Sequence, residues 1–600
     1  MNKFYYLVLF LASLSLPSMG QEATVKGTVT DSKTKETLIG VNVTYGTNQG
    51  VATDAFGNYL IKLPAGKHTL RLKYIGYGET TRDFTIKPGE TRTINIALIE
   101  ETKLLDEVVV SAGKHEQKLS EVTVSVDIIK SKTLENTNTT SIEKALNQVP
   151  GVTIYQDQAS IRGGSGYSYG AGSRVLLLLD DLPLLTGSGG EAKWWIIPVE
   201  NIDQIEIIKG ASSALYGSSA MNGVINVRSG WPSSKPETKV IGYSGIYGNP
   251  ARKSNQWWGE NNPLFSGYQI LHSQKFGNFD VVASVNFLSD NDYREDVFTK
   301  SIGGNFKTRY RSKKYEGLSY GINGYFLRRW ASSFLIWKDK DSVYSPATST
   351  MQKTNTYSVI DPFVVYYKGN NRHTLKGRIF YTDNDINTAQ SNSDLVYYGE
   401  YQYQHVFPKD LVLNSGLSGT YCSSNSEIYG FTKHYSSASA LFAQIDKKIK
   451  RWSLSGGARL EGFRDGNMPM EWKPVFRAGI NYQLLKQTFI RSSIGQGYRY
   501  PTIAERYTAT SSEGINVFPN PSLTSETGWS GEIAFKQGFG ISNWKGYIDV
   551  AGFISEYTNM IEFQFGTYVP DEVTHAFEQG GFSVFQLFET VVRYSGFKAT

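Results

Sequence analysis

The chain has 600 residues, of which 40% are hydrophobic, 19% charged and 13% aromatic, and its net charge is +6. Disordered chains and helical membrane proteins have more extreme compositions, so both classes are excluded. The positive charge is spread along the chain without a basic block, which argues against a nucleic-acid partner. Many aromatic residues, 59 Gly and only 19 Pro favour numerous β-strands joined by tight turns.

Residues that bind metals or form disulfides are scarce. The single cysteine, Cys422, excludes a disulfide framework, and the seven histidines show no metal-ligand spacing. Residues 166–170 fit the pattern G-x-S-x-G, but they lie in a Gly-rich stretch with no helix after it, so a catalytic serine is not expected. We therefore expect no enzyme activity, no cofactor and no metal site.

The N-terminus has the layout of an export signal. Lys3 precedes an apolar stretch over residues 4–16, and small residues follow at 18–20. A membrane-spanning helix needs about 20 apolar residues, and Pro17 interrupts this stretch too early. We predict a cleaved signal peptide over residues 1–20.

Residues 23–99 alternate short β-type runs with Gly, Pro and Asp turn signals, which predicts a small all-β sandwich. Four motifs in this segment resemble the carboxypeptidase regulatory-like domain, namely 25–31 (VKGTVTD), 50–54 (GVATD), 57–59 (GNY) and 74–77 (YIGY). The resemblance implies a transthyretin-like β-sandwich without catalytic residues.

Residues 104–113 (LLDEVVVSAG) place an acidic pair before three valines. Such a segment has high β-propensity, so it is either an exposed strand that can pair with the edge of another sheet or an apolar linker.

Residues 114–228 have a mixed α and β character. Residues 141–148 (SIEKALNQ) predict a short helix that ends before Pro150, and residues 175–179 predict a fully apolar strand. The apolar run continues to residue 185, interrupted by Asp180 and Asp181. This segment is expected to form a small α+β globule.

From residue 231 to residue 600, apolar and polar residues alternate in runs of strand length, for example over residues 279–287. Longer polar stretches rich in Ser, Asn and Tyr lie between them, for example at 337–357 and 423–435. This pattern is typical of a transmembrane antiparallel β-barrel. A large soluble β-sandwich or propeller is the alternative, although no blade motif repeats.

Three motifs in the middle of the chain resemble the plug domain of TonB-dependent outer-membrane receptors. They are 160–163 (SIRG), 174–184 (RVLLLLDDLPL) and 205–227 (IEIIKGASSALYGSSAMNGVINV). Residues 497–505 (GYRYPTIAE) and 520–526 (NPSLTSE) resemble two signatures of the barrel in the same family. The resemblance implies an all-β-dominated protein, with the sandwich at 23–99, a TonB-contacting segment at 104–113, a plug at 114–228 and a barrel at 231–600.

The resemblance also implies roles for particular residues. TonB would add a strand to Asp106, Glu107, Val108, Val109, Val110 and Ser111. Basic plug residues Arg162 and Lys209 would face barrel carboxylates, among which the sequence does not choose: Glu505, Glu526 and Glu532. Candidate substrate contacts are Tyr167, Tyr169, Trp194 and Trp195. The pair Trp194 and Trp195 and the pair Trp257 and Trp258 each fit either a substrate contact or an aromatic belt at the membrane interface.

The implied function is TonB-dependent import across the outer membrane of a Gram-negative bacterium. The expected substrate is a ferric siderophore, haem or a cobalamin-like chelate, and the expected partners are TonB, outer-membrane lipid and this nutrient. Alternatives are a glycan or peptide importer that works with a surface lipoprotein, and a surface sensor or adhesin.

The length of the barrel segment suggests a missing C-terminal part. A barrel of 22 strands would leave about 17 residues for each strand and its connection, and several loops look longer than this permits. The chain also ends in FKAT, whereas chains of this family commonly end in an aromatic residue. We therefore expect the sequence to be incomplete at its C-terminus.

Overall fold

The computed structural model describes residues 22–33, 35–45, 49–54, 56–74, 77–99, 107–137, 141–165, 171–512, 515–541, 544–563 and 577–595. The chain divides into two compact units, Met1–Glu101 and Thr102–Thr600. The signal peptide predicted at residues 1–20 lies outside the described residues. None of the described helices is long and apolar enough to cross a membrane.

The first unit is a β-sandwich. Its two sheets have the orders β4-β1-β7, with β8 also paired to β1, and β3-β2-β5-β6. In β1, β4, β5, β6 and β8 alternate residues are buried in one shared core, because side chains in a strand alternate between its faces. The strands are β1 (Ala23–Asp31), β2 (Asn42–Tyr45), β3 (Gln49–Ala52), β4 (Asn58–Leu63), β5 (Gly66–Lys73), β6 (Thr80–Ile86), β7 (Thr91–Thr93) and β8 (Ile96–Leu98). The predicted β-sandwich is confirmed.

The second unit contains a small α+β plug built on a five-stranded sheet of order β11-β16-β17-β14-β15. Its strands are β11 (Val126–Lys130), β14 (Val175–Leu179), β15 (Leu182–Pro183), β16 (Ile202–Lys209) and β17 (Gly223–Ser229). Every residue of β14 is buried, because this strand is covered on both faces. This burial explains its uninterrupted apolar sequence.

Shorter elements complete the plug. Two pairs of strands flank the sheet: β9 (Val108–Val109) with β10 (Gln117–Lys118), and β12 (Val152–Tyr155) with β13 (Gln158–Ile161). The helices are α2 (Ser131–Asn136), α3 (Ile142–Leu146), α4 (Ser213–Tyr216) and the short 3-10 turns η2 (Trp194–Ile196) and η3 (Val199–Asn201). Helix α3 falls within the helix predicted at residues 141–148, with its apolar side chains buried.

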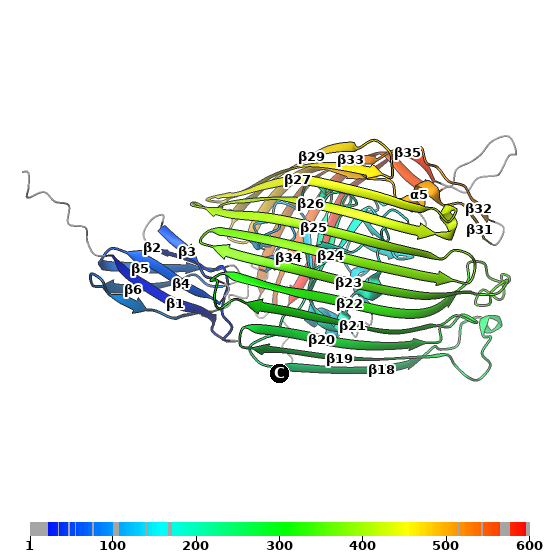
Figure 1. Cartoon of the computed structure of the whole chain (residues 1–600), viewed down its shortest axis with the longest axis horizontal. Helices are drawn as coiled ribbons and strands as arrows, with labels where there is room; N and C mark the ends of the chain where they lie inside the picture. The colour runs from blue at the N-terminus through cyan, green and yellow to red at the C-terminus, as the bar shows by residue number, and fades with distance from the viewer. Residues whose placement is uncertain are drawn as a thin grey trace, which may run out of the picture. The chain divides into compact units, whose positions relative to one another are not determined.

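Within the described residues, the barrel part of the second unit is one antiparallel sheet of 16 strands, each paired with its neighbours in this sheet (Figure 1). The strands are β18 (Glu237–Ile246), β19 (Leu264–Phe276), β20 (Phe279–Asp290), β21 (Thr299–Arg311), β22 (Leu318–Ser333), β23 (Met351–Lys368), β24 (Asn371–Ile386), β25 (Asn392–Phe407), β26 (Leu411–Ser426), β27 (Lys433–Ile449), β28 (Trp452–Asp465), β29 (Glu471–Leu485), β30 (Thr488–Arg499), β33 (Glu526–Ile541), β34 (Trp544–Phe563) and β35 (Phe577–Ser595).

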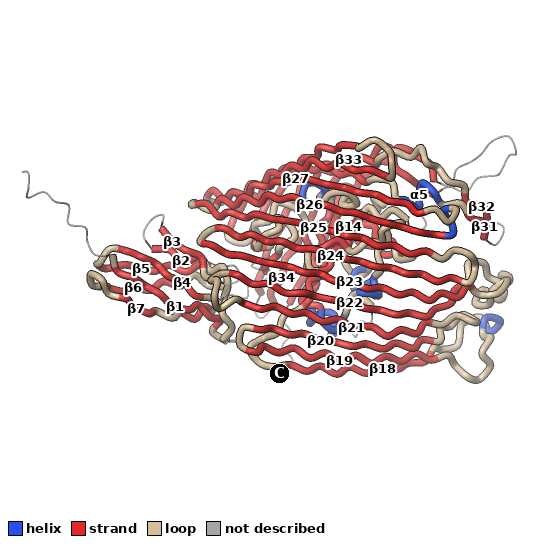
Figure 2. Tube along the Cα trace, in the orientation of Figure 1, coloured by secondary structure: helices blue, strands red, loops and turns tan. Residues whose placement is uncertain are grey.

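The connections of this sheet differ between its two ends. Tight turns such as residues 277–278 and 369–370 lie at one end, and long loops such as 247–263, 334–350 and 500–525 lie at the other (Figure 2). Antiparallel order produces this arrangement, because every second connection returns to the same end. The loop after β30 carries helix α5 (Ile503–Tyr507) and the hairpin of β31 (Thr510–Ser512) and β32 (Ile515–Val517).

The outer face of the sheet is apolar and the inner face is polar or covered by the plug. In β27, for example, Leu441 and Ile445 are more than half exposed, whereas Phe442 and Gln444 are buried. Soluble proteins rarely expose large continuous apolar surfaces, whereas a transmembrane barrel requires one. The predicted transmembrane β-barrel is confirmed.

The plug lies in the lumen of the barrel, where Figure 1 shows it behind the green and yellow strands. Its largest hydrophobic cluster is shared with the inner face of β22, β23 and β24, including Tyr325, Tyr357 and Phe380. The barrel strands have 10 to 20 residues, whereas bare membrane crossing needs about 9–11. The long strands therefore account for much of the chain. The predicted incompleteness at the C-terminus stays a prediction.

Candidate functional site

The plug and the barrel are joined by buried ion pairs, of which the most enclosed involves Arg174 at the start of β14. Its Nε and Nη2 donate to the two carboxylate oxygens of Glu526, at 3.1 and 2.6 Å. Arg499 of β30 donates to Glu526 and to Glu505 of α5, with four contacts of 2.7 to 2.8 Å. Two positive and two negative groups therefore compensate one another away from water, as buried charges require.

Local structure sets the position of Glu505 in this cluster. Helix α5 begins with a capping box, in which the Thr502 hydroxyl accepts from the Glu505 N–H and the Glu505 carboxylate accepts from the Thr502 N–H. The same carboxylate receives the guanidinium of Arg499. The loop that follows β30 is thus fastened to the end of its own strand.

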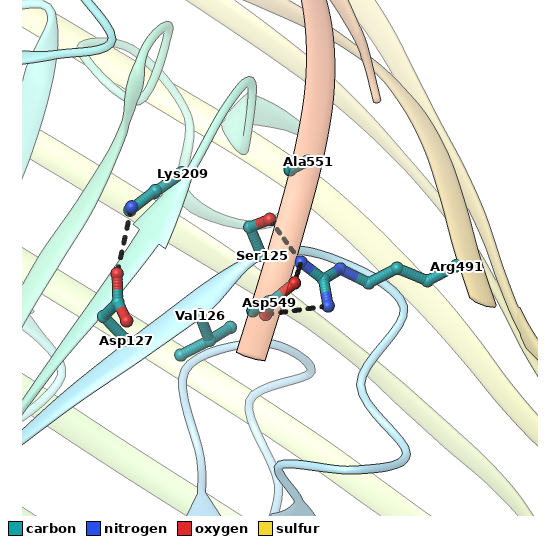
Figure 3. Close-up of a pocket in the computed structure, with 7 residues that line it drawn as sticks. All are labelled: Ser125, Val126, Asp127, Lys209, Arg491, Asp549 and Ala551. Atoms are coloured by element: carbon teal, nitrogen blue, oxygen red, sulfur yellow. Dashed lines mark hydrogen bonds and ion pairs between the residues drawn. The ribbon is translucent and has the colours of Figure 1, made fainter. Parts of the chain in front are cut away.

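A second ion cluster joins Arg162 of the plug to Glu532 of β33, with Nη2 and Oε2 2.5 Å apart. Arg491 of β30 lies 3.2 Å from Glu532 and 2.9 Å from Asp549 of β34. Ser125 of the plug donates to Glu532 at 2.7 Å and accepts from Arg491 at 2.8 Å. A small polar pocket lies beside this cluster, and Figure 3 shows the residues that line it: Ser125, Val126, Asp127, Lys209, Arg491, Asp549 and Ala551.

The structure places the five residues predicted for plug–barrel charge contacts in different ways. Arg162 faces Glu532, and Glu526 and Glu505 belong to the Arg174 cluster. Lys209, however, lies 3.0 Å from Asp127 of β11 and donates to the Pro150 carbonyl, so this ion pair is formed within the plug (Figure 3). The reason is the register of β11 on β16, which brings Asp127 beside the end of β16.

Arg174 was missed by the sequence analysis, although it lies within a quoted motif. Only its position directly before the apolar strand distinguished it, and that position does not reveal a partner 352 residues away.

Asp180 and Asp181 form a further connection between plug and barrel. Both adopt positive φ in the tight turn between β14 and β15. Asp180 lies 3.2 Å from Lys307 of β21, and Asp181 lies 2.8 Å from Lys376 of β24. Burial acts to raise the pKa of Asp181, but the charges of Arg228 and Lys376 outweigh it and hold this pKa well below its usual value. In the sequence these residues stood out as interruptions of an apolar run within a plug motif, and no partner was predicted for them.

The segment predicted to contact TonB is docked on the plug. Val108 and Val109 pair with β10, and the N–H groups of Val110 and Ser111 donate to one carboxylate oxygen of Glu206, at 3.0 and 2.7 Å. Tyr216 donates to the Ser111 carbonyl at 2.6 Å. Val109 and Ser111 have no exposed surface.

The prediction of an exposed strand is therefore wrong for the described part of this segment. The physical reason is that Val109 joins a hydrophobic cluster of the plug, while Glu206 accepts the two N–H groups that a free strand edge would leave unpaired. Glu107 is half-buried and begins the described part, whereas Asp106 lies outside it.

The four candidate substrate residues also differ. Tyr167 and Tyr169 lie outside the described residues. Trp194 is buried and donates to the Asp157 carbonyl at 2.8 Å, so it belongs to the plug core. Trp195 is half-buried on the lumen side, beside Arg329 of β22.

Two further features concern the loop end and metal binding. Trp257 and Trp258 pack edge to face in the loop after β18, and Trp257 is 39% exposed.

Within the residues that the structure describes, no group of three or more His, Cys, Asp or Glu side chains is arranged to hold a metal ion.

Family models match three parts of the chain. The CarboxypepD_reg-like domain matches residues 25–110, the TonB-dependent Receptor Plug Domain residues 118–224, and the "TonB dependent receptor-like, beta-barrel" residues 242–597.

Curated relatives include transporters and receptors of this kind. The vitamin B12 transporter BtuB of Vibrio cholerae is 23% identical over 463 residues, which cover 76% of this chain and 71% of BtuB. The TonB-dependent receptor SusC of Bacteroides thetaiotaomicron is 31% identical over 295 residues, which cover 44% of this chain and 28% of SusC. The match to the TonB-dependent receptor P3 of Formosa agariphila likewise spans less than a third of P3.

Among solved structures, the siderophore receptor PirA of Pseudomonas aeruginosa aligns with a TM-score of 0.61 at 14% identity, covering 78% of this chain and 80% of PirA. The Serratia marcescens hemophore receptor HasR aligns with a TM-score of 0.62 at 13% identity, covering 80% of each chain. These likenesses show a shared fold.

Proposed function

The chain belongs to the TonB-dependent receptor family, and we propose that it actively imports a large, scarce nutrient across the outer membrane of a Gram-negative bacterium. Proteins of this family are transporters and receptors, so the chain is not an enzyme. The observation that carries the proposal is the plug, which fills the lumen and is tied to the segment at residues 107–111.

The contacts of this segment support a mechanical role. Val110 and Ser111 are bound by Glu206, which lies in the centre of β16, and β16 is hydrogen-bonded to β11 on one side and β17 on the other. A pull on the segment therefore acts on the middle of the plug sheet. TonB would add its own strand to the segment by β-augmentation, once the segment has left Glu206.

Opening also requires that plug–barrel contacts break. The ion pairs of Arg162, Arg174, Asp180 and Asp181 with barrel side chains resist movement of the plug. Because an ion pair loses most of its attraction over a few ångströms once water enters, a small displacement of the plug suffices to release each contact.

We propose a ferric siderophore, haem or a cobalamin-like chelate as the substrate. The similarity to a vitamin B12 transporter extends over three quarters of the chain, and the fold is shared with siderophore and hemophore receptors. The substrate would bind from the loop end, where the long loops meet the plug. Trp195 is the described substrate candidate with a side chain on the lumen side.

A glycan or peptide importer that works with a surface lipoprotein is the second candidate. Two observations favour it: the N-terminal CarboxypepD_reg-like domain and the 31% identity to SusC over 295 residues.

Growth of a strain that lacks the gene tests the proposal. Under iron restriction, with one ferric chelate or haem supplied at a time, the strain should fail on the transported iron source and recover with the intact gene. A variant that lacks residues 106–111 should reach the outer membrane and bind the substrate without restoring growth. Unimpaired growth on every iron source and on cobalamin would favour the glycan or peptide candidate, whereas full rescue by the variant would refute TonB-dependent import.

A further inference from the structure

A cluster of cations and aromatic rings lies where the plug meets β22 and β23. Lys193 and Trp195 come from the plug, and Arg329, Lys353 and Tyr357 come from the two barrel strands. The Arg329 guanidinium lies 4.9 Å from the centre of the Trp195 ring, and the Lys193 ammonium lies 5.4 Å from it. The rings of Trp195 and Tyr357 are 6.4 Å apart.

The cluster faces the lumen near its loop end. Arg329 is paired with Asn355, and Lys353 with Ala331, so both cations share the inner face with buried Tyr357. Both residues lie close to Ser333 and Met351, which border the long loop at 334–350. A substrate that enters from the loop end therefore meets these side chains early.

Positive charge exceeds negative charge in this cluster. Around Lys353, the carboxylates of Glu191 and Asp157 face the two cations Arg329 and Lys193, and Lys353 itself adds a third positive charge. Lys193 is ion-paired with Glu191. Among the described residues, neither Arg329 nor Lys353 has a carboxylate within 4.0 Å, unlike other cations of the lumen such as Lys307, Lys376, Arg378 and Arg499.

Arg329 is nevertheless held in place by neutral groups. Its guanidinium donates to the Thr299 hydroxyl at 3.2 Å and to the Asn355 side-chain carbonyl at 3.4 Å, and it lies against Trp195. A guanidinium that is oriented but lacks a counter-ion is well suited to bind an anionic oxygen, because little conformational freedom is lost on binding.

We propose that Arg329 and Lys353, together with Lys193, bind an anionic group of the transported substrate. The inference rests on the proposed import function and narrows its substrate to a chelate or other nutrient that presents negatively charged oxygen atoms. These atoms belong to carboxylate, catecholate or phosphate groups, which share the chemistry that the three cations recognise.

Binding to the purified full-length protein in detergent tests this proposal. The probes are ferric citrate for carboxylate, a ferric tris-catecholate, inorganic phosphate, and a neutral ferric trihydroxamate, titrated at low and high salt. We expect one of the anionic probes to bind, with an affinity that falls as salt rises. Lys353→Gln and Arg329→Gln should each weaken that binding about tenfold, the effect of losing one charge-assisted contact.

The chain provides a matched control. Arg328 is the neighbour of Arg329 on the opposite, outer face of β22, where it stacks on Trp330. Arg328→Gln should leave the affinity and its salt dependence unchanged. Lys353→Gln is the variant least exposed to folding artefacts, because the Lys353 side chain makes no hydrogen bond or ion pair with the part of the chain that the structure describes.

Three results would overturn the proposal: no anionic probe binds, the neutral probe binds as tightly as the anionic ones, or Lys353→Gln and Arg329→Gln behave like Arg328→Gln. These results are separate from the growth test. Import of a neutral chelate that depends on residues 106–111 would leave the proposed function intact while refuting the anionic site.

Discussion

The buried ion pair between Arg174 and Glu526 is expected to be a principal link between plug and barrel. Neither side chain has exposed surface, and two hydrogen bonds join them. Arg499 and Glu505 complete a group whose charges sum to zero. Arg174→Gln and Glu526→Gln each leave one charge without compensation in a site that excludes water.

The expected magnitude follows from this burial. Removing one partner of a buried ion pair costs about 3–5 kcal/mol, so each single substitution should lower the free energy of plug opening by this amount. The double variant Arg174→Gln/Glu526→Gln restores a neutral group with two amides. Its cost should therefore fall short of the sum of the single costs by about 1–3 kcal/mol.

Hydrogen exchange measured by mass spectrometry gives the opening free energy of plug peptides from β14 and β17 in detergent. Lys239→Gln is the control, because Lys239 also joins the barrel to the plug, at 3.0 Å from Glu135, but the two side chains are 35% and 57% exposed. Its cost should stay below about 1 kcal/mol. Strictly additive costs, or single costs no larger than that of Lys239→Gln, would refute the reasoning.

Three further predictions concern other parts of the chain. The pKa of Asp181 is depressed in the folded protein. Its contribution to stability is therefore complete above the usual carboxylate pKa of about 4 and is lost only as the pH falls through the lower folded pKa. Asp181→Asn should lower the thermal unfolding midpoint of the plug at neutral pH, and an unchanged midpoint would contradict this. Glu206→Gln should weaken two charge-assisted hydrogen bonds by about 1–2 kcal/mol in total, and should therefore raise the mobility of a spin label attached to a cysteine introduced by Val110→Cys. The label is selective because the one native cysteine is buried. If the label is equally mobile in Glu206→Gln and in the protein with Glu206 intact, this carboxylate is excluded as the anchor. Gly27→Ala should destabilise the N-terminal sandwich by about 3 kcal/mol, since the new alanine Cβ would lie 1.9 Å from the Ile94 carbonyl oxygen. Calorimetry should show that the unfolding transition of the barrel is unchanged. A shift of both transitions would argue against independent units.

Much of the architecture was predictable because it depends on local patterns. Alternation of apolar and polar residues reports which face of a strand is buried, and it correctly predicted both the sandwich and the barrel. The apolar run of β14 and the helix around Ile142–Leu146 were also recognisable, since burial on both faces or on one helical face leaves a direct trace in the sequence.

The ionic contacts of the plug were less predictable because each joins residues far apart in the chain. Arg162 was expected to face a barrel carboxylate, and the structure places Glu532 beside it, 370 residues away. For Lys209, only the register of β11 on β16 decides that Asp127 is its partner. No sequence pattern distinguishes these alternatives, because a solvated charge and a buried one use the same residue types.

The amino-acid sequence by itself determined the family, the order of the domains and the identity of the segment that TonB is proposed to bind. Only the tertiary structure decided that this segment is docked on Glu206, and that Asp180 and Asp181 reach Lys307 and Lys376 of the barrel. The physical reason is that a backbone edge or a buried charge pairs only with a donor or acceptor that lies within about 3 Å. The packing of the plug against the barrel strands decides which distant residue provides that group.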